Sequence, residues 1–158
     1  MRHAPLILGM FGLGVLGCGG GGGGGEPITG TIAMQYGDSS PALVVGSAIQ
    51  SSMATNMLVQ IGSDNVDCDT NLVDIEGFEF PKGSFVYFDV AKAPGSHPTA
   101  GVTVMKSTSD MVNINGSTGM VTIDSAGDRV TGSVTFTTTD NDVGTISVSG
   151  TFDVLRCF

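Results

Sequence analysis

Hydrophobic and polar residues alternate along the carboxyl-terminal half of the chain. In the stretch VTGSVTF, one face carries Val130, Gly132, Val134 and Phe136, while serine and threonine occupy the other face. The stretch TISVSGTFDV, residues 145–154, repeats this pattern. Successive side chains of a pleated strand point to opposite faces, so both stretches are predicted to be half-buried antiparallel strands.

Shorter stretches upstream carry the same kind of pattern. Strands are expected at residues 29–36, 41–50, 56–62, 85–91, 101–107, 111–114 and 120–123. Asn115-Gly116 favours positive φ angles and predicts a hairpin between the last two, so that residues 110–155 form a four-stranded meander. Residues 42–57 could instead hold a helical turn. About eight or nine short strands with polar turns indicate an all-β fold, either an antiparallel β-sandwich or a small barrel-like sandwich.

Composition and charge fit a secreted β-protein and count against one class of partner. The chain has 158 residues, which fits one domain, and only 13% of them are charged. The formal net charge is -9, and it becomes -10 without residues 1–17, where Arg2 is the only residue counted as charged. An acidic surface without basic patches repels phosphate backbones, so we expect no nucleic-acid partner.

The amino terminus has the features of an export signal. Arg2 and His3 give a short basic start, and Leu6–Leu16 is an apolar run of 11 residues. A membrane-spanning helix needs about 20 apolar residues. This run is too short to span a membrane and has the length of a signal-peptide core, so residues 1–17 are predicted to be a signal peptide.

The residues at the end of this run, Val15-Leu16-Gly17-Cys18, resemble the lipobox of bacterial lipoproteins. The resemblance implies cleavage after Gly17 and covalent lipid on Cys18, which would anchor the chain in a membrane. Glycine at position 19, where aspartate is absent, resembles the signal for sorting to the outer membrane. A generic secretory signal with an incidental cysteine is the alternative.

Seven glycines, Gly19–Gly25, follow the cysteine. A glycine coil of this length has an end-to-end distance of about 15 Å, which suits a tether. A phosphate-binding loop would need a following lysine and hydroxyl residue on a helix, whereas Glu26-Pro27 follows here. Residues 18–27 are therefore assigned to the lipidated cysteine and its tether, and residues 28–158 to the all-β domain.

Two further cysteines, Cys68 and Cys157, remain in the mature chain. In an oxidising compartment such a pair is most simply a disulfide, which would hold the end of the last strand. A zinc site is the rival interpretation, but the mature chain offers only His97 and no CxxC motif as further ligands. We therefore predict a Cys68–Cys157 disulfide and no zinc site.

An acidic stretch surrounds Cys68. Asp67, Asp69 and Glu76 fall at ligand positions of an EF-hand spacing, which makes a calcium site possible on chemical grounds. Thr70 occupies the position where that loop needs glycine, and no flanking helices are predicted. An acidic surface loop held through Cys68 is the alternative, so no metal site is assigned with certainty.

The remaining chemical candidates are single residues. His97 lies in the stretch KAPGSHPTA, which is predicted to be a loop, and it lacks an identifiable nucleophile. Met53 and Met57 could bind a soft metal, although methionines more often fill an irregular core. These residues make an enzyme the weakest of the functional hypotheses, and we expect a non-catalytic protein.

The carboxyl terminus carries a second resemblance. The stretch DRVTGSVTFTTTD and the later GTISVSGTFDVLRC resemble the end of small, functionally uncharacterised bacterial lipoproteins. The resemblance implies an all-β domain with a fixed last strand and carries no activity. The sequence thus predicts a lipid-anchored envelope module that binds or scaffolds an envelope protein. A carrier of a small apolar ligand in a sandwich or barrel cavity is the alternative.

Overall fold

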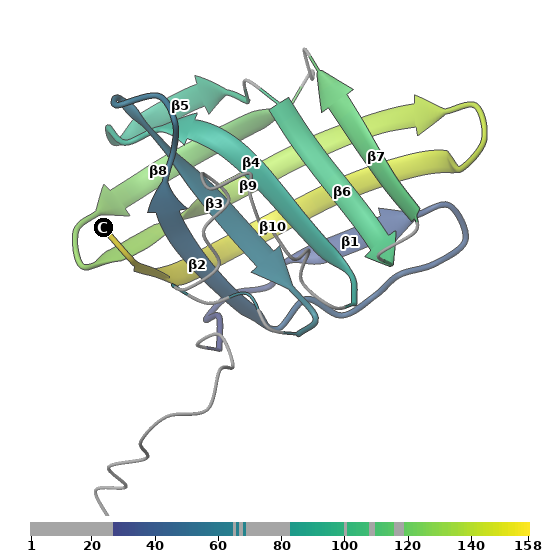
Figure 1. Cartoon of the computed structure of the whole chain (residues 1–158), viewed down its shortest axis with the longest axis horizontal. Coiled ribbons are helices and arrows are strands. Elements are labelled where there is room, and N and C mark those ends of the chain that lie inside the picture. Colours follow the sequence, from purple (N-terminus) through teal and green to yellow (C-terminus); the bar gives the residue numbers. More distant parts are fainter. Residues whose placement is uncertain are drawn as a thin grey trace, which may run out of the picture.

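The computed structural model describes residues 27–64, 66, 68, 83–99, 101–107, 110–115 and 119–158. These residues form ten β-strands and no helix, which confirms the all-β fold (Figure 1). The strands are β1 (Ala33–Tyr36), β2 (Val45–Gln50), β3 (Asn56–Gly62), β4 (Phe85–Ala91), β5 (Gly95–Pro98), β6 (Gly101–Ser107), β7 (Asp110–Asn115), β8 (Met120–Ala126), β9 (Arg129–Asp140) and β10 (Gly144–Arg156). None of the described residues belongs to a helix that could cross a membrane.

The strands form one open sheet that folds into two layers. The strand order is β5-β8-β9-β10-β2-β3-β4-β6-β7, and β1 pairs with β10 beside this path. Figure 1 shows β2, β3, β4, β6 and β7 lying across the layer of β1, β5, β8, β9 and β10. The layers join where the end of β10 pairs with β2, with Leu155 opposite Ser47 and Arg156 opposite Ala48. This pair is parallel, whereas the other strand pairs are antiparallel, so the sheet is mixed.

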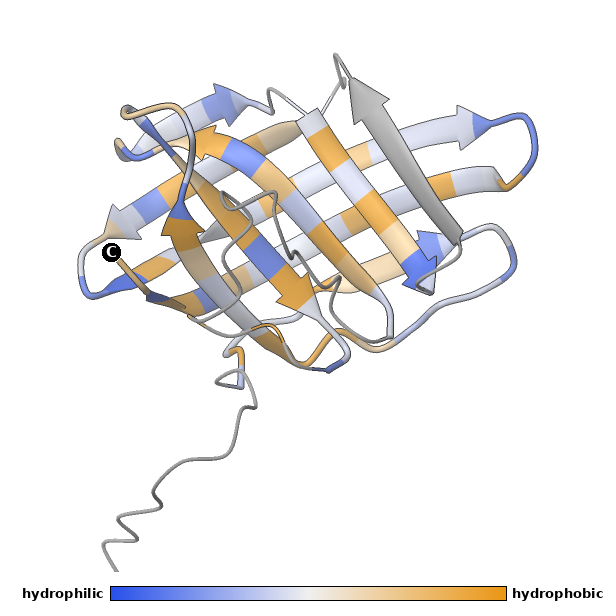
Figure 2. Cartoon of the chain, viewed as in Figure 1, coloured by the Kyte–Doolittle hydropathy of each residue, from blue (hydrophilic) through white to orange (hydrophobic). Residues whose placement is uncertain are grey.

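The main core fills the space between the two layers. The alternation of β9 and β10 predicts its residues correctly: Val134 and Phe136 of β9 and Phe152 of β10 are almost fully buried. The Phe88 ring of β4 meets the Phe152 ring at a centroid distance of 5.7 Å, which joins the layers. Figure 2 shows the hydrophobic residues spaced along the strands as this alternation requires.

The layer of β2, β3, β4 and β6 is also buried on its outer face. Phe85 and Met105 point away from the main core, yet their exposed fractions are 1% and 0%. Ser47 and Gln60 form a polar pair on the same face, with Gln60 Nε2 donating to Ser47 Oγ at 2.7 Å, and both are 1% exposed. This layer therefore buries residues on both faces, such as Phe85 and Phe88 of β4.

One predicted strand pairing is wrong. The turn signal at Asn115-Gly116 predicts that β7 and β8 form a hairpin, but β7 is the last strand in the strand order and β8 is the second strand from the other end. β7 pairs with β6, while β8 pairs with β5 and β9. A turn signal reports only local backbone preference, and here the chain leaves one layer after β7 and enters the other at β8. The predicted four-stranded meander is therefore only the three-stranded β8–β9–β10 part.

Several strand boundaries also differ from the prediction. The stretch predicted to be a loop around His97 contains β5, a short strand that pairs with β8 and raises the number of strands to ten. β2 begins at Val45 rather than at residue 41, and the region that could have held a helical turn contains strands and a turn. β9 and β10 are longer than predicted and leave a turn of three residues between them. The side chain of Asp140, the last residue of β9, holds this turn, since its Oδ1 accepts hydrogen bonds from the N–H groups of Asp142 and Val143.

Candidate functional site

The first described segment, residues 27–32, enters the domain between β2 and β10. Pro27 forms an isolated bridge with Val45, and the Ile28 N–H donates to the Val44 carbonyl at 2.9 Å. On the other side, the Thr31 N–H donates to the Thr151 carbonyl at 3.0 Å. The point at which the predicted tether reaches the domain is therefore fixed by backbone hydrogen bonds on two sides. Cys18 itself lies outside the described residues.

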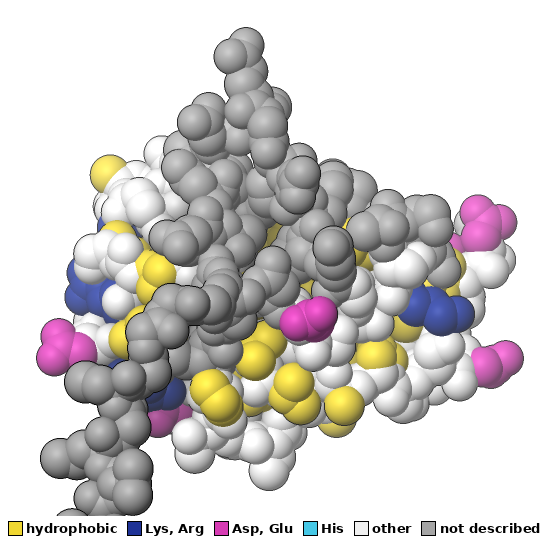
Figure 3. Space-filling model, turned by 60° about the horizontal axis from the view of Figure 1, so that its bottom comes forward, with side chains coloured by type: hydrophobic (Ala, Val, Ile, Leu, Met, Phe, Trp, Pro, Cys, Tyr) yellow, Lys and Arg dark blue, Asp and Glu magenta, His cyan; other side chains and the backbone are white. Residues whose placement is uncertain are grey.

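An apolar surface surrounds this entry point. We define the anchor-side face as Pro27, Ile28, Ile32, Ala42 and Val44. Val44 is 49% exposed, Pro27 and Ala42 are exposed, and Ile28 and Ile32 are partly buried against the core. The face is continuous because residues 32–33 lie beside Ala42, through the Ala33–Ala42 bridge. Figure 3 shows a row of hydrophobic side chains on this side of the molecule.

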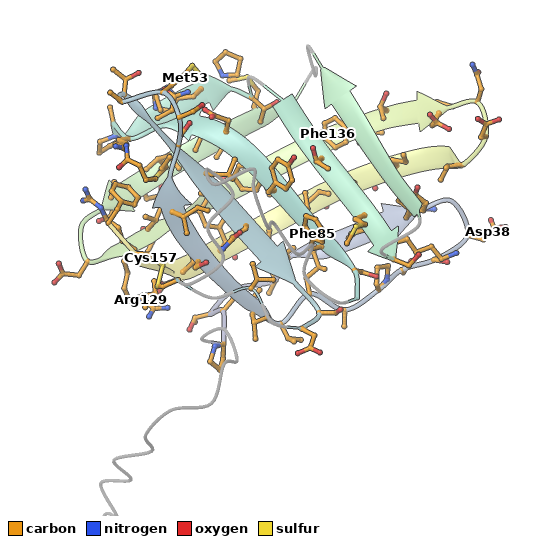
Figure 4. The ribbon with its side chains drawn as sticks, viewed as in Figure 1. Asp38, Met53, Phe85, Arg129, Phe136 and Cys157 are labelled. Atoms are coloured by element: carbon orange, nitrogen blue, oxygen red, sulfur yellow. A yellow bond between two sulfur atoms is a disulfide. The ribbon has the colours of Figure 1, made fainter. Side chains whose placement is uncertain are left out.

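The anchor-side face is also poor in charge. From Pro27 to Ser63 the only charged residue is Asp38, and Figure 4 shows Asp38 in the turn after β1, at one end of the molecule. The next acidic residue, Asp64, follows β3 and is exposed at the border of the face. In the sequence, this face is visible only as an almost uncharged stretch in an otherwise acidic chain. The strand patterns alone do not show that the exposed residues of this stretch share one surface.

The predicted disulfide is present at the other end of β2. Cys68 and Cys157 form a disulfide, with a Cα–Cα distance of 5.2 Å and a sequence separation of 89 residues. The Cys157 N–H donates to the Ala48 carbonyl at 2.9 Å, so the bridge holds the chain terminus against β2. The disulfide uses both cysteines, which removes the ligands that the rival zinc site would need.

The last residue, Phe158, contacts two cations. The Lys92 ammonium lies 4.6 Å from the centre of the Phe158 ring, and the Arg156 guanidinium lies 4.3 Å from it. Arg156 Nη1 also donates to the Ala126 carbonyl at 2.8 Å. Cation–π contacts at exposed sites are worth about 0.5–1 kcal/mol each, so the two cations help to hold the Phe158 ring in place.

A polar cluster that the sequence analysis missed holds the turn between β2 and β3. Asp89 of β4 accepts hydrogen bonds from Ser51 Oγ at 2.6 Å and from the Asn56 amide. Ser51 Oγ in turn accepts a hydrogen bond from the Met53 N–H at 3.2 Å. A carboxylate on a strand face gives no sequence signal for its partners, because they lie 33 and 38 residues away along the chain. The cluster orders a turn, and its serine hydroxyl belongs to a residue that is only 6% exposed.

His97 does not assemble a catalytic site with the described residues. Its Nε2 atom is hydrogen-bonded to the Ala93 carbonyl at 2.7 Å, two residues before β5 begins. No hydrogen bond from His97 to a serine, aspartate or glutamate side chain occurs among the residues that the structure describes. The histidine therefore contributes to local structure at the β5 edge.

The described residues give little support for a metal site. Asp67, Asp69 and Glu76 of the calcium hypothesis lie outside the described residues. Among the residues that are described, no three histidine, cysteine, aspartate or glutamate side chains gather closely enough to hold a metal ion. Met57 is fully buried in the core, whereas Met53 is 46% exposed in the β2–β3 turn, so the two methionines do not form a soft-metal pair.

No protein-family model matches the chain, and neither the curated proteins nor the solved structures include a significant match to it.

Proposed function

We propose that this chain is a lipid-anchored protein of the bacterial outer membrane that presents a rigid β-sandwich to an envelope protein partner, without catalysing a reaction. One observation carries the proposal. The lipobox cysteine, Cys18, is followed by a glycine tether that ends at Pro27, and Pro27 is held on the domain by its bridge to Val45. This arrangement connects an export and lipidation signal directly to an ordered β-domain.

The use of polar side chains supports a binding or scaffolding role over an enzymatic one. Asp89 holds the β2–β3 turn, and Asp140 holds the β9–β10 turn. Asp153 pairs with Arg129 at an N–O distance of 2.5 Å. These carboxylates are engaged in structural contacts, which leaves them poorly placed for acid–base chemistry.

The alternative, a carrier of a small apolar ligand, has less support. A carrier needs an interior cavity with a few converging polar groups. Among the described residues, the space between the layers is filled by large side chains such as Phe88, Phe136 and Phe152. The observed interior therefore favours a module that uses its outer surface.

Metabolic labelling with radioactive palmitate in a bacterial host tests the anchor. We expect label on the wild-type protein, no label on Cys18→Ser, and recovery of the wild type with outer membranes on a density gradient. Cys68→Ser is the matched control, since it also removes one cysteine but leaves the lipobox intact and should keep the label. Equal labelling of wild type and Cys18→Ser would contradict the proposal.

A further inference from the structure

We propose that the anchor-side face rests on the phospholipid bilayer that holds the lipid of Cys18, so that the β-sandwich has one fixed orientation on the membrane. The inference rests on the proposed lipid anchor and adds a binding surface to it. The partner is the bilayer surface itself, and the residues that touch it are Pro27, Ile28, Ile32, Ala42 and Val44.

The length of the chain between the anchor and the domain limits which face can reach the bilayer. Pro27 lies nine residues after Cys18. Such a segment spans at most about 30 Å when fully extended, and about 16 Å as a flexible coil. A domain of about 130 residues has a radius of gyration of about 14 Å and hence a width of about 35 Å. At the coil length, which is less than half of this width, only the side of the domain that contains Pro27 lies within reach of the membrane.

The entry segment cannot swing freely to turn another face downward. Its backbone N–H groups donate hydrogen bonds to the Val44 carbonyl on one side and to the Thr151 carbonyl on the other. Gly30 and Gly150 let the two backbones approach so closely that no side chain fits between them. The sheet therefore fixes the position of Pro27 on the domain, and Val44 lies directly beside the entry segment.

Charge favours the same face. The mature chain is strongly acidic, and an anionic membrane surface repels its carboxylates. Between Pro27 and Ser63 only Asp38 is charged, and Asp38 lies in the turn after β1 (Figure 4). An approach through the anchor-side face brings its apolar side chains to the bilayer. Asp153, which lies beside Thr29 of the entry segment, is paired with Arg129. Glu26, directly before Pro27 in sequence, is the acidic residue nearest to this face along the chain. Asp64 remains at the border of the contact.

A tryptophan placed at Val44 tests this orientation without background fluorescence from other tryptophans, because the chain has none. The acylated full-length protein carrying Val44→Trp is purified from bacterial membranes and reconstituted into phosphatidylcholine vesicles, with and without bromine on the acyl chains. Met53→Trp is the matched control. Met53 is 46% exposed, close to the 49% of Val44, and lies at the opposite end of β2, about 20 Å away at 3.3 Å per residue.

We expect brominated lipid to quench most of the Val44→Trp emission and the emission maximum to shift to shorter wavelength on vesicles. The Met53→Trp protein should show neither change. Ala42→Trp, on the same face, gives a second probe if the Val44 variant fails to fold, as judged by its resistance to trypsin. Equal quenching of the Val44 and Met53 probes, or stronger quenching at Met53, would overturn the inference.

The same samples separate failure of the inference from failure of the proposed function. If the Val44→Trp and Ala42→Trp proteins sediment with vesicles and carry the acyl mass on Cys18, but their tryptophan emission is unchanged, the lipid anchor stands and the face does not touch the bilayer. If the protein lacks the acyl mass and stays in the supernatant, the proposed function is wrong and the inference falls with it.

Discussion

Gly30 and Gly150 lie where the entry segment runs beside β10, and neither position has room for a side chain. A Cβ atom on Gly150 would lie 2.1 Å from the Thr31 carbonyl oxygen, and one on Gly30 would lie 2.2 Å from the Thr151 carbonyl oxygen. Both glycines also have positive φ angles, 145° for Gly30 and 133° for Gly150, which other residues rarely adopt. This reciprocal contact holds the base of the predicted tether against the last strand.

Gly150→Ala should therefore lower the free energy of unfolding by about 3 kcal/mol, because it adds backbone strain and displaces the entry segment. Urea denaturation monitored by circular dichroism measures the loss. Gly144→Ala is the control, since Gly144 has a φ of 89° but no atom within 4 Å of its Cβ position. That variant should lose about 1 kcal/mol, through strain alone. Equal losses in the two variants would refute the close-contact explanation.

The disulfide closes a long loop and should be a major source of stability. Crosslinking residues 89 apart stabilises the folded state by about 4–5 kcal/mol in the chain-entropy model. The variant Cys68→Ala/Cys157→Ala should therefore unfold at a much lower urea concentration than the oxidised wild type.

Reductant provides the control for this prediction. It should lower the denaturation midpoint of the wild type to that of the Cys68→Ala/Cys157→Ala variant and leave the variant unchanged. Thiol titration under denaturing, non-reducing conditions should find no free thiol in a Cys18→Ser protein. Two titratable thiols in that protein would show that the bridge does not form.

Asp89 should stabilise the β2–β3 turn through Ser51 and Asn56. Hydrogen bonds to a charged group contribute about 1.5–3 kcal/mol, so Asp89→Ala is expected to lose about 2–3 kcal/mol of unfolding free energy. A double-mutant cycle with Ser51→Ala should give a coupling energy of about 1 kcal/mol. Asp124→Ala, at an exposed position on β8, should change stability little. A coupling energy of zero would mean that the Ser51–Asp89 contact does not form in solution.

Phe85 should contribute as much to the free energy of unfolding as a residue of the main core, although it points to the outer face of its layer. It is 1% exposed and stacks on Tyr87 at a ring-centroid distance of 5.9 Å. Removing a buried phenylalanine costs about 3–5 kcal/mol, and we expect this loss in thermal denaturation of Phe85→Ala as well as of Phe136→Ala. Phe158→Ala, at a position that is 38% exposed, should lose only about 1–2 kcal/mol, through its two cation–π contacts. A loss for Phe85→Ala as small as that for Phe158→Ala would show that the outer face is open to water.

Local patterns predicted the carboxyl-terminal strands well because their apolar residues alternate cleanly. β9 and β10 each bury one face on the core and expose much of the other, so a period of two is visible in the sequence. β5 escaped prediction because Gly95–Pro98 has no such pattern, and its residues form a strand only by pairing with β8. The layer around Phe85 and Met105 also hides its organisation, since residues on both faces are buried.

The sequence by itself determined the all-β class, the main-core faces of β9 and β10, and the Cys68–Cys157 pairing, because alternation and the pairing of two remaining cysteines depend on the residues alone. Only the tertiary structure decided that β7 and β8 lie in opposite layers, that β10 runs parallel to β2, and that the anchor-side face gathers around Pro27 and Val44. These relationships join residues far apart along the chain. They arise because each layer must bury its apolar face against the other, and no local preference specifies which strands then become neighbours.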